Sequence, residues 1–165
     1  FIRRYKGLDL LMEAFADVRL RQFPVKLLIA GEFYEPKEPF FELIKKHALD
    51  DLVVLHTDFI PEKEVAYYFN AADLVAQPYR SATQSGVSQI AYHFEKPMLV
   101  TNVGGLADIV PHGKVGYVVE PEVSKIADAL VDFLENNRSV EYIENIREEK
   151  KKYDWKVMVE TLNKI

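Results

Sequence analysis

The sequence predicts an α/β domain built as a three-layer sandwich, with a mainly parallel sheet between helices. Short apolar runs, typical of buried strands, alternate along the chain with segments whose apolar residues recur at helical spacing. This alternation favours parallel strands joined by right-handed helical crossovers. With 165 residues, 48% apolar and 28% charged, the chain also has the size and composition of one globular domain.

The first half of the chain alternates regularly between helical and strand patterns. A helix is expected over residues 7–22, where apolar residues recur every three or four positions, and Pro24 ends it. An apolar run over 25–30 stops at Gly31 and predicts a buried strand. The same criteria then predict a helix over 40–48, a strand over 52–55, a helix from Pro61 to Ala72 with proline in its first position, and a strand over 74–76.

The second half continues the alternation and ends in a more polar tail. The patterns predict a helix over 85–95, strands over 98–101 and 117–119, and a helical face over 126–134. The charged run 148–152 is interpreted as a solvated helix face. A last helix capped by Asp154 is expected to carry one apolar face, made of Trp155, Met158, Val159, Leu162 and Ile165. Such a face predicts contact with another surface.

Composition excludes several classes of function. The net charge of −5 argues against nucleic-acid binding, and no apolar run is long enough to cross a membrane. The chain has no cysteine, which excludes disulfides and thiolate metal sites and fits a cytoplasmic location. Its four histidines lack the spacing of metal ligands, so no metal and no cofactor is predicted.

Two loops of small residues follow successive strands. Thr83-Gln84-Ser85-Gly86 leads into the expected helix 85–95, and Thr101-Asn102-Val103-Gly104-Gly105 follows the expected strand 98–101. Parallel strands end at one edge of a sheet, where small residues and a helix N-terminus allow backbone amides to approach a phosphate. The alternative is that both loops are ordinary turns.

Six segments resemble, in order, those of a known family. They are Arg3-Arg4-Tyr5-Lys6-Gly7-Leu8, Lys26-Leu27-Leu28-Ile29-Ala30-Gly31, Ala71-Ala72-Asp73-Leu74-Val75-Ala76-Gln77-Pro78, Lys96-Pro97-Met98-Leu99-Val100-Thr101, Gly104-Gly105-Leu106-Ala107-Asp108 and Gly116-Tyr117-Val118-Val119-Glu120-Pro121. Together they resemble the C-terminal, nucleotide-sugar-binding half of a retaining GT-B glycosyltransferase. This large family includes sucrose synthase and bacterial polysaccharide transferases.

The resemblance implies a Rossmann-like domain and a set of nucleotide-binding residues. Lys6 matches the family's phosphate-binding lysine in position, whereas Arg3 is assigned by residue type alone. The implied set is Arg3, Lys6, Phe59, Ile60, Gln84, Ser85, Gly86, Val87, Gly104 and Gly105. Each has a structural alternative: solvated surface for the basic residues, helix capping for Ser85 and core packing for Phe59 and Ile60.

The resemblance also implies partners. A nucleotide-diphosphate sugar would bind here, and a sugar acceptor would be held by a missing N-terminal GT-B domain, through which any peripheral membrane contact would run. Residues 1–152 would form the nucleotide-sugar-binding domain and 153–165 a helix crossing to that missing domain. Because Phe1-Ile2-Arg3-Arg4 reads as the end of a strand, the chain is expected to be part of a longer protein, inactive by itself.

One departure from the family pattern concerns catalysis. The family carries two glutamates around the phosphate-binding helix, and the matching positions here are Ala82 and Ile90. No catalytic residue is therefore predicted. Besides a glycosyltransferase acting in polysaccharide biosynthesis, a non-catalytic nucleotide-binding or interaction module and a sugar-nucleotide epimerase domain remain alternatives.

Overall fold

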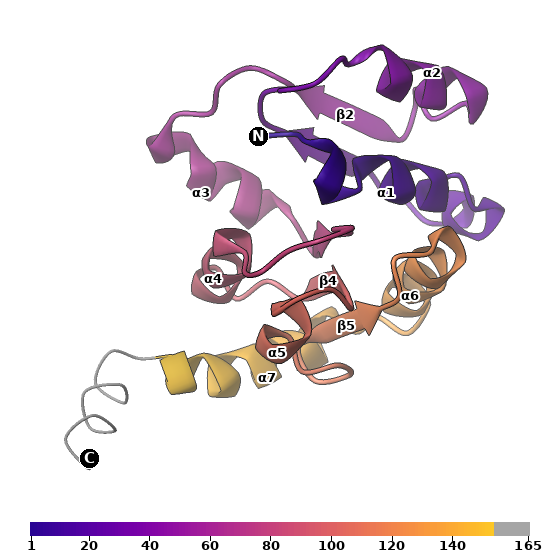
Figure 1. Ribbon diagram of the computed structural model, residues 1–165. Helices are drawn as coiled ribbons and strands as arrows, with labels where there is room; N and C mark the ends of the chain where they lie inside the picture. Colours follow the sequence, from indigo (N-terminus) through magenta and orange to yellow (C-terminus); the bar gives the residue numbers. More distant parts are fainter. Residues whose placement is uncertain (154–165) are drawn as a thin grey trace.

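The computed structural model describes residues 1–153, which alternate between strands and helices (Figure 1). The strands are β1 (Leu27–Ala30), β2 (Val53–His56), β3 (Val75–Gln77), β4 (Met98–Thr101) and β5 (Gly116–Val119). The helices are α1 (Leu8–Phe15), α2 (Glu38–Lys46), α3 (Glu62–Ala71), α4 (Gly86–His93), α5 (Leu106–Ile109), α6 (Val123–Glu135) and α7 (Ser139–Glu149). Short 3-10 turns span Arg4–Lys6, Val18–Gln22 and Lys150–Tyr153. The expected final helix, with Trp155 to Ile165, lies outside the described residues.

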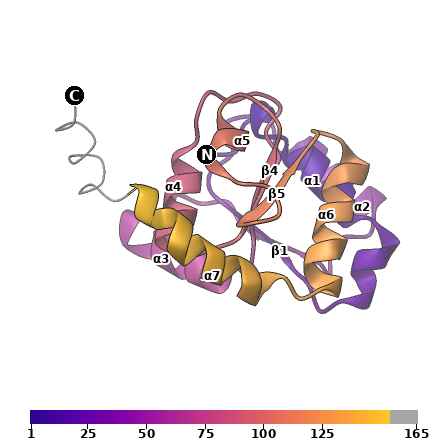
Figure 2. The same cartoon turned by 90° about the horizontal axis from the view of Figure 1, so that it is seen from below.

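All strand pairs are parallel, as predicted, but the strands form two separate ladders. β1 pairs with β2, and β4 pairs with β3 on one side and β5 on the other. Helices cover both faces: α1, α2 and α6 gather on one side, and α3 and α4 lie on the other (Figures 1 and 2). The predicted α/β class is confirmed, whereas the expectation of one continuous sheet is not met between β1 and β3.

Two clusters of buried apolar side chains hold the layers together. The larger cluster joins α1 and α6 to β1, with Met12, Leu20 and Ile126 fully buried. The smaller lies around β4 and includes Val100 and Ile146. Burial of such side chains supplies the main stabilisation, roughly 1.5–3 kcal/mol for each large one. All four residues of β4 are buried, which explains the apolar run Met98-Leu99-Val100 that makes up most of the strand.

The first helix is shorter than predicted. The apolar spacing suggested one helix over 7–22, but α1 ends at Phe15 and a separate 3-10 turn covers Val18–Gln22. Asp17 causes the break, because its carboxylate accepts a hydrogen bond from the backbone amide of Arg19 at 2.9 Å. An aspartate side chain that binds the nearby backbone in this way competes with helix continuation.

The prediction that the charged run 148–152 is fully solvated is wrong for Glu149. That side chain is buried and accepts a hydrogen bond from Lys114 Nζ at 2.7 Å. The end of α7 is also tied to the loop after α4, since Arg147 Nε donates to Glu95 Oε2 at 2.7 Å and Lys150 pairs with the same carboxylate. The hydrogen bonds from Lys150 and Arg147 hold the pKa of Glu95 below its usual range. Helix α7, of which the sequence indicated only the charged end at 148–152, is therefore fixed at its C-terminal end by ion pairs.

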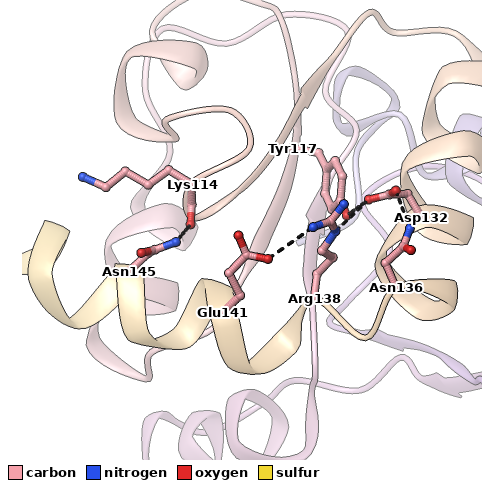
Figure 3. A network of polar contacts seen from close by, with 7 residues as sticks. All are labelled: Lys114, Tyr117, Asp132, Asn136, Arg138, Glu141 and Asn145. Carbon is pink, nitrogen blue, oxygen red and sulfur yellow. Dashed lines mark hydrogen bonds and ion pairs between the residues drawn. The ribbon is translucent and has the colours of Figure 1, made fainter.

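A polar network fixes the other end of α7 (Figure 3). Tyr117 Oη donates to Asp132 Oδ2 at 2.6 Å, and Arg138 Nε lies 3.3 Å from the same oxygen. Arg138 also pairs with Glu141 on the first turn of α7. Strand β5, helix α6 and helix α7 thus meet at one carboxylate, Asp132.

Replacing Tyr117 with phenylalanine is expected to destabilise the fold by about 0.5–1.5 kcal/mol at neutral pH, because Asp132 is partly exposed and water can replace the lost donor. The Tyr117 hydrogen bond is the main cause that lowers the pKa of Asp132. A lowered carboxylate pKa adds stability above the unfolded-state pKa of about 3.9 and loses it as pH falls through the folded-state value. Urea unfolding should therefore show a smaller difference in unfolding free energy between Tyr117→Phe and the parent at pH 3 than at pH 7. Tyr67→Phe, whose ring is exposed, serves as the control.

Candidate nucleotide-binding site

Three loops meet at the carboxyl edge of the strands. The first is the 3-10 turn Arg4–Lys6 with Gly7, the second follows β3, and the third follows β4. Gly7 has φ 63°, and a Cβ atom there would lie 1.9 Å from the Pro78 carbonyl oxygen. Glycine is required at this contact, because a side chain would collide with the backbone of the second loop. The first loop is therefore pressed against the second, and this fixes the position of Lys6.

Lys6 is a half-buried cation at this junction. Its Nζ lies 5.8 Å from the centre of the Tyr79 ring, within cation–π range. Burial, and secondarily the charge of Arg3, lowers the pKa of the Lys6 ammonium. Among the ion pairs formed within residues 1–153, none involves Lys6. A partly desolvated ammonium without a carboxylate partner is suited to bind an anion.

Ser85 begins helix α4 and faces the same ring. Its Oγ accepts from the Val87 amide at 3.3 Å, the N-capping bond of the helix, and lies 3.3 Å from Tyr79 Oη. Gly86 is exposed, with nothing within 4 Å of the place where a Cβ atom would be. The start of α4 is therefore capped yet open to solvent. A helix N-terminus of this kind favours negative charge.

The Gly104-Gly105 loop packs directly on the loop that precedes α4. Gly104 has φ 52°, and a Cβ atom there would lie 1.5 Å from the Ala82 carbonyl oxygen. The Gly105 amide donates to the Thr83 carbonyl oxygen at 3.0 Å. Both glycines are thus needed for backbone contact between the two loops. The two predicted small-residue loops do lie together, and Lys6 is linked to them through Tyr79.

Buried polar side chains on the core side of these loops fix their positions. Gln77 and Ser88 bond to each other at 3.1 Å in the core, joining the end of β3 to α4. Thr101 Oγ1 donates to the Tyr79 carbonyl oxygen, which ties the end of β4 to the loop after β3. The sequence analysis did not assign Gln77 and Tyr79 to the site. The feature that could have indicated them is a polar and an aromatic residue on either side of Pro78, directly after an apolar strand.

The remaining predicted residues lie at the margins of this cluster. The Arg3 guanidinium stacks over Tyr34, 5.1 Å from the ring centre, and so is held by a different ring from the one beneath Lys6. Phe59 is 67% exposed and lines, with Ile60, a separate cavity of about 240 Å³. Gln84 is exposed beside Gly105, its Cγ 3.9 Å from the Cβ position of that glycine. The structure therefore brings Lys6 together with residues 83–87 and 104–105. Arg3 lies close enough to Lys6 for its charge to add to the effect of burial in lowering the pKa of that ammonium, and Phe59 and Ile60 line the cavity beside Gly31.

Ala82 and Ile90, the positions at which the resemblance led us to look for glutamates, lie on this loop and helix. Ala82 supplies the carbonyl that Gly104 approaches, and Ile90 is exposed on α4. Neither offers a carboxylate. Within residues 1–153 no group of three or more histidine, aspartate or glutamate side chains converges as a metal site would require. No helix in this range is long and apolar enough to span a membrane.

Replacing Ser85 with alanine is expected to cost about 1 kcal/mol of unfolding free energy, because the N-cap bond to Val87 is lost. Ser85→Thr keeps a capping hydroxyl and serves as the matched control. Thermal unfolding of the two variants checks this. Equal stability of the alanine and parent chains would show that the Ser85 hydroxyl contributes nothing as a cap.

Comparisons with known proteins give the family. Residues 1–136 match the family of glycosyl transferases group 1. A D-inositol 3-phosphate glycosyltransferase from Pseudarthrobacter chlorophenolicus is 33% identical over 121 residues, which are 72% of this chain and 29% of that protein. The chain thus spans less than a third of this relative's length.

Solved structures share the fold. The C-terminal domain of the glycosyl transferase group 1 protein LpcC from Francisella tularensis superposes with a TM-score of 0.82 at 23% identity, covering 93% of this chain and 83% of that one. HepE from Anabaena, solved in complex with UDP, gives a TM-score of 0.80 at 20% identity and covers 99% of this chain and 46% of its own. The family match covers residues 1–136, and the parallel α/β topology agrees with these solved structures. The chain therefore belongs to the glycosyl transferases group 1 family, as the C-terminal half of a GT-B fold.

Proposed function

We propose that this domain binds the diphosphate of a nucleotide-activated sugar at the edge where Lys6, the start of α4 and the Gly104-Gly105 loop meet. The observation that carries the proposal is the half-buried Lys6 ammonium, which has no carboxylate partner within residues 1–153 and lies over the ring that bonds to Ser85. A diphosphate would supply the missing negative charge. The exposed backbone at Gly86 would allow its oxygens to approach the amides of the helix start.

This geometry suits the chemistry of sugar transfer. The nucleoside diphosphate is the leaving group, and negative charge grows on its oxygens as the glycosidic bond breaks. Fixed amides and a cation placed at those oxygens stabilise the transition state more than the ground state. We propose that the whole protein transfers the sugar to a glycan, lipid or other acceptor. That acceptor would be bound outside this domain, as in an enzyme with two domains around a cleft.

One observation favours a second candidate function. Because Ala82 and Ile90 replace the family's two glutamates, the site lacks carboxylates that could bind sugar or ribose hydroxyls. A module that binds the nucleotide without transferring a sugar would have this composition. The epimerase alternative has no such support, since the family match is to glycosyl transferases.

Ligand-observed NMR with UDP, GDP, ADP and uridine tests the proposal. Half of a cleft should bind a nucleoside diphosphate weakly, in the high-micromolar to millimolar range, or about 4–6 kcal/mol. Uridine should bind less well than UDP, since it lacks the diphosphate. Absence of binding by all three diphosphates at millimolar concentration would refute the proposed site. Binding by the domain, with no sugar transfer by the whole protein, would favour the module.

A further inference from the structure

Tyr79 contacts both the cation and the helix start of the proposed diphosphate site. Lys6 Nζ lies over its ring, and its hydroxyl oxygen lies 3.3 Å from Ser85 Oγ. The Tyr5 ring packs edge-on against it, with the ring centres 5.9 Å apart, and the Thr101 hydroxyl donates to its carbonyl oxygen. Because Tyr79 is only 6% exposed, these contacts fix the position of its hydroxyl.

The hydroxyls of Tyr79 and Ser85 carry one more proton than they use. Each hydroxyl has one proton to donate and can accept two hydrogen bonds. Ser85 Oγ accepts from the Val87 amide, and the contact between the two hydroxyls uses one of their two protons. Within residues 1–153 neither hydroxyl forms a further hydrogen bond. One proton of the pair is therefore available to a ligand.

The chemistry of the pair assigns the available proton to Ser85. A phenol is more acidic than an aliphatic alcohol, so Tyr79 is the better donor of the two. Burial raises the pKa of the Tyr79 phenol, which keeps it protonated and able to donate at neutral pH. With Tyr79 donating to Ser85 Oγ, the serine proton is left at the start of α4, next to the exposed Gly86.

From this geometry we propose that Tyr79 is a positioning residue of the diphosphate site, which donates to Ser85 and so directs the Ser85 proton to a phosphate oxygen. The inference rests on the proposed function, because a phosphate is the acceptor that it requires. One hydrogen bond polarises the next in a chain, so the Tyr79 donor makes Ser85 a stronger donor. The 3.3 Å contact is longer than the usual distance of about 2.7–2.8 Å between two hydroxyls, and so can shorten as the anion draws on the serine proton.

The test is a double-mutant cycle measured by titration with UDP and with uridine. Tyr79→Phe keeps the ring beneath Lys6 and removes only the hydroxyl. It should weaken UDP binding about three- to tenfold and leave uridine binding unchanged. In the Ser85→Ala background the same substitution should cause no further loss, because no serine proton remains to be directed. Ser85→Thr, which keeps a hydroxyl, should bring the loss back.

Tyr92→Phe is the matched control. Tyr92 is also buried, lies near the C-terminal end of α4 and donates its hydroxyl to a backbone carbonyl, that of Ile109, at 2.6 Å. Its removal should lower the stability of the fold without weakening UDP binding. In the parent chain, UDP should also shift the NMR signal of Tyr79 Cζ, the carbon that bears the hydroxyl, and uridine should leave that signal in place.

Three results would overturn the proposal. They are unchanged UDP binding by Tyr79→Phe, an additive loss in the Ser85→Ala background, and equal weakening by Tyr92→Phe, which would mean that disturbed packing of α4 explains the loss. Absence of UDP binding by the parent chain would refute the proposed function and this inference together. UDP binding that does not respond to Tyr79→Phe would refute this inference alone.

Discussion

Replacing Lys6 with methionine is expected to weaken UDP binding by roughly 10- to 150-fold, the equivalent of a lost charged hydrogen bond of about 1.5–3 kcal/mol. Uridine binding should change far less, because uridine has no diphosphate for the ammonium to contact. The folded domain should be as stable as the parent or more so, since burial lowers the pKa of Lys6 and thus disfavours its charge in the absence of ligand. Titrations of UDP and uridine, with urea unfolding, measure all three effects.

Arg4→Met is the matched control for Lys6→Met. It removes a positive charge two residues away whose side chain is exposed, so its effect on UDP should be small and should fade with added salt. If both substitutions weakened UDP binding equally, general attraction by a basic segment would explain the result. If Lys6→Met weakened the binding of UDP and of uridine equally, Lys6 would not contact phosphate.

Gly104→Ala is expected to destabilise the domain by more than about 3 kcal/mol, because two penalties combine. The left-handed conformation at φ 52° costs a residue with a Cβ atom roughly 1–2 kcal/mol. In addition, the new Cβ would lie 1.5 Å from the Ala82 carbonyl oxygen, so the loop must move away from residues 82–84. The same movement should weaken UDP binding, and urea unfolding with UDP titration measures both losses.

Two other glycines separate these penalties. Gly113 also has a left-handed conformation, at φ 71°, but nothing lies within 4 Å of its Cβ position, so Gly113→Ala should show the conformational penalty alone. Gly86→Ala, at the open start of α4, should be neutral or slightly stabilising. If Gly104→Ala cost no more than Gly113→Ala, the contact between the two loops would contribute little.

Sequence patterns predicted the buried apolar elements better than the helix limits that depend on polar contacts. Strand β4 was predicted with its observed limits, because its residues are buried on both faces and three of the four form one apolar run, Met98 to Val100. The break after Phe15 and the start of α7 at Ser139 were missed, since both depend on polar contacts: Asp17 with the Arg19 amide, and Arg138 with Asp132. Such contacts leave no periodic signal in the sequence.

In the candidate site, too, local sequence patterns were predictive and contacts between distant residues were not. Small residues after successive strands indicated that Ser85-Gly86 and Gly104-Gly105 would share an edge, and the structure brings the two loops together. The part played by Tyr79 was not predictable, because its contacts join residues from three loops: the Lys6 ammonium, the Ser85 hydroxyl and the Thr101 hydroxyl. The binding roles themselves stay predictions.

Chemical-shift mapping of UDP on the isotope-labelled chain tests the central proposal most directly. The amide signals of Gly86, Val87, Gly104 and Gly105 should show the largest saturable shifts with UDP and smaller shifts with uridine, since the diphosphate is proposed to lie at the edge that these residues form. Saturable shifts confined to other surfaces, such as α7 or the Phe59 loop, with these four amides unchanged, would contradict a diphosphate site at this edge of the sheet.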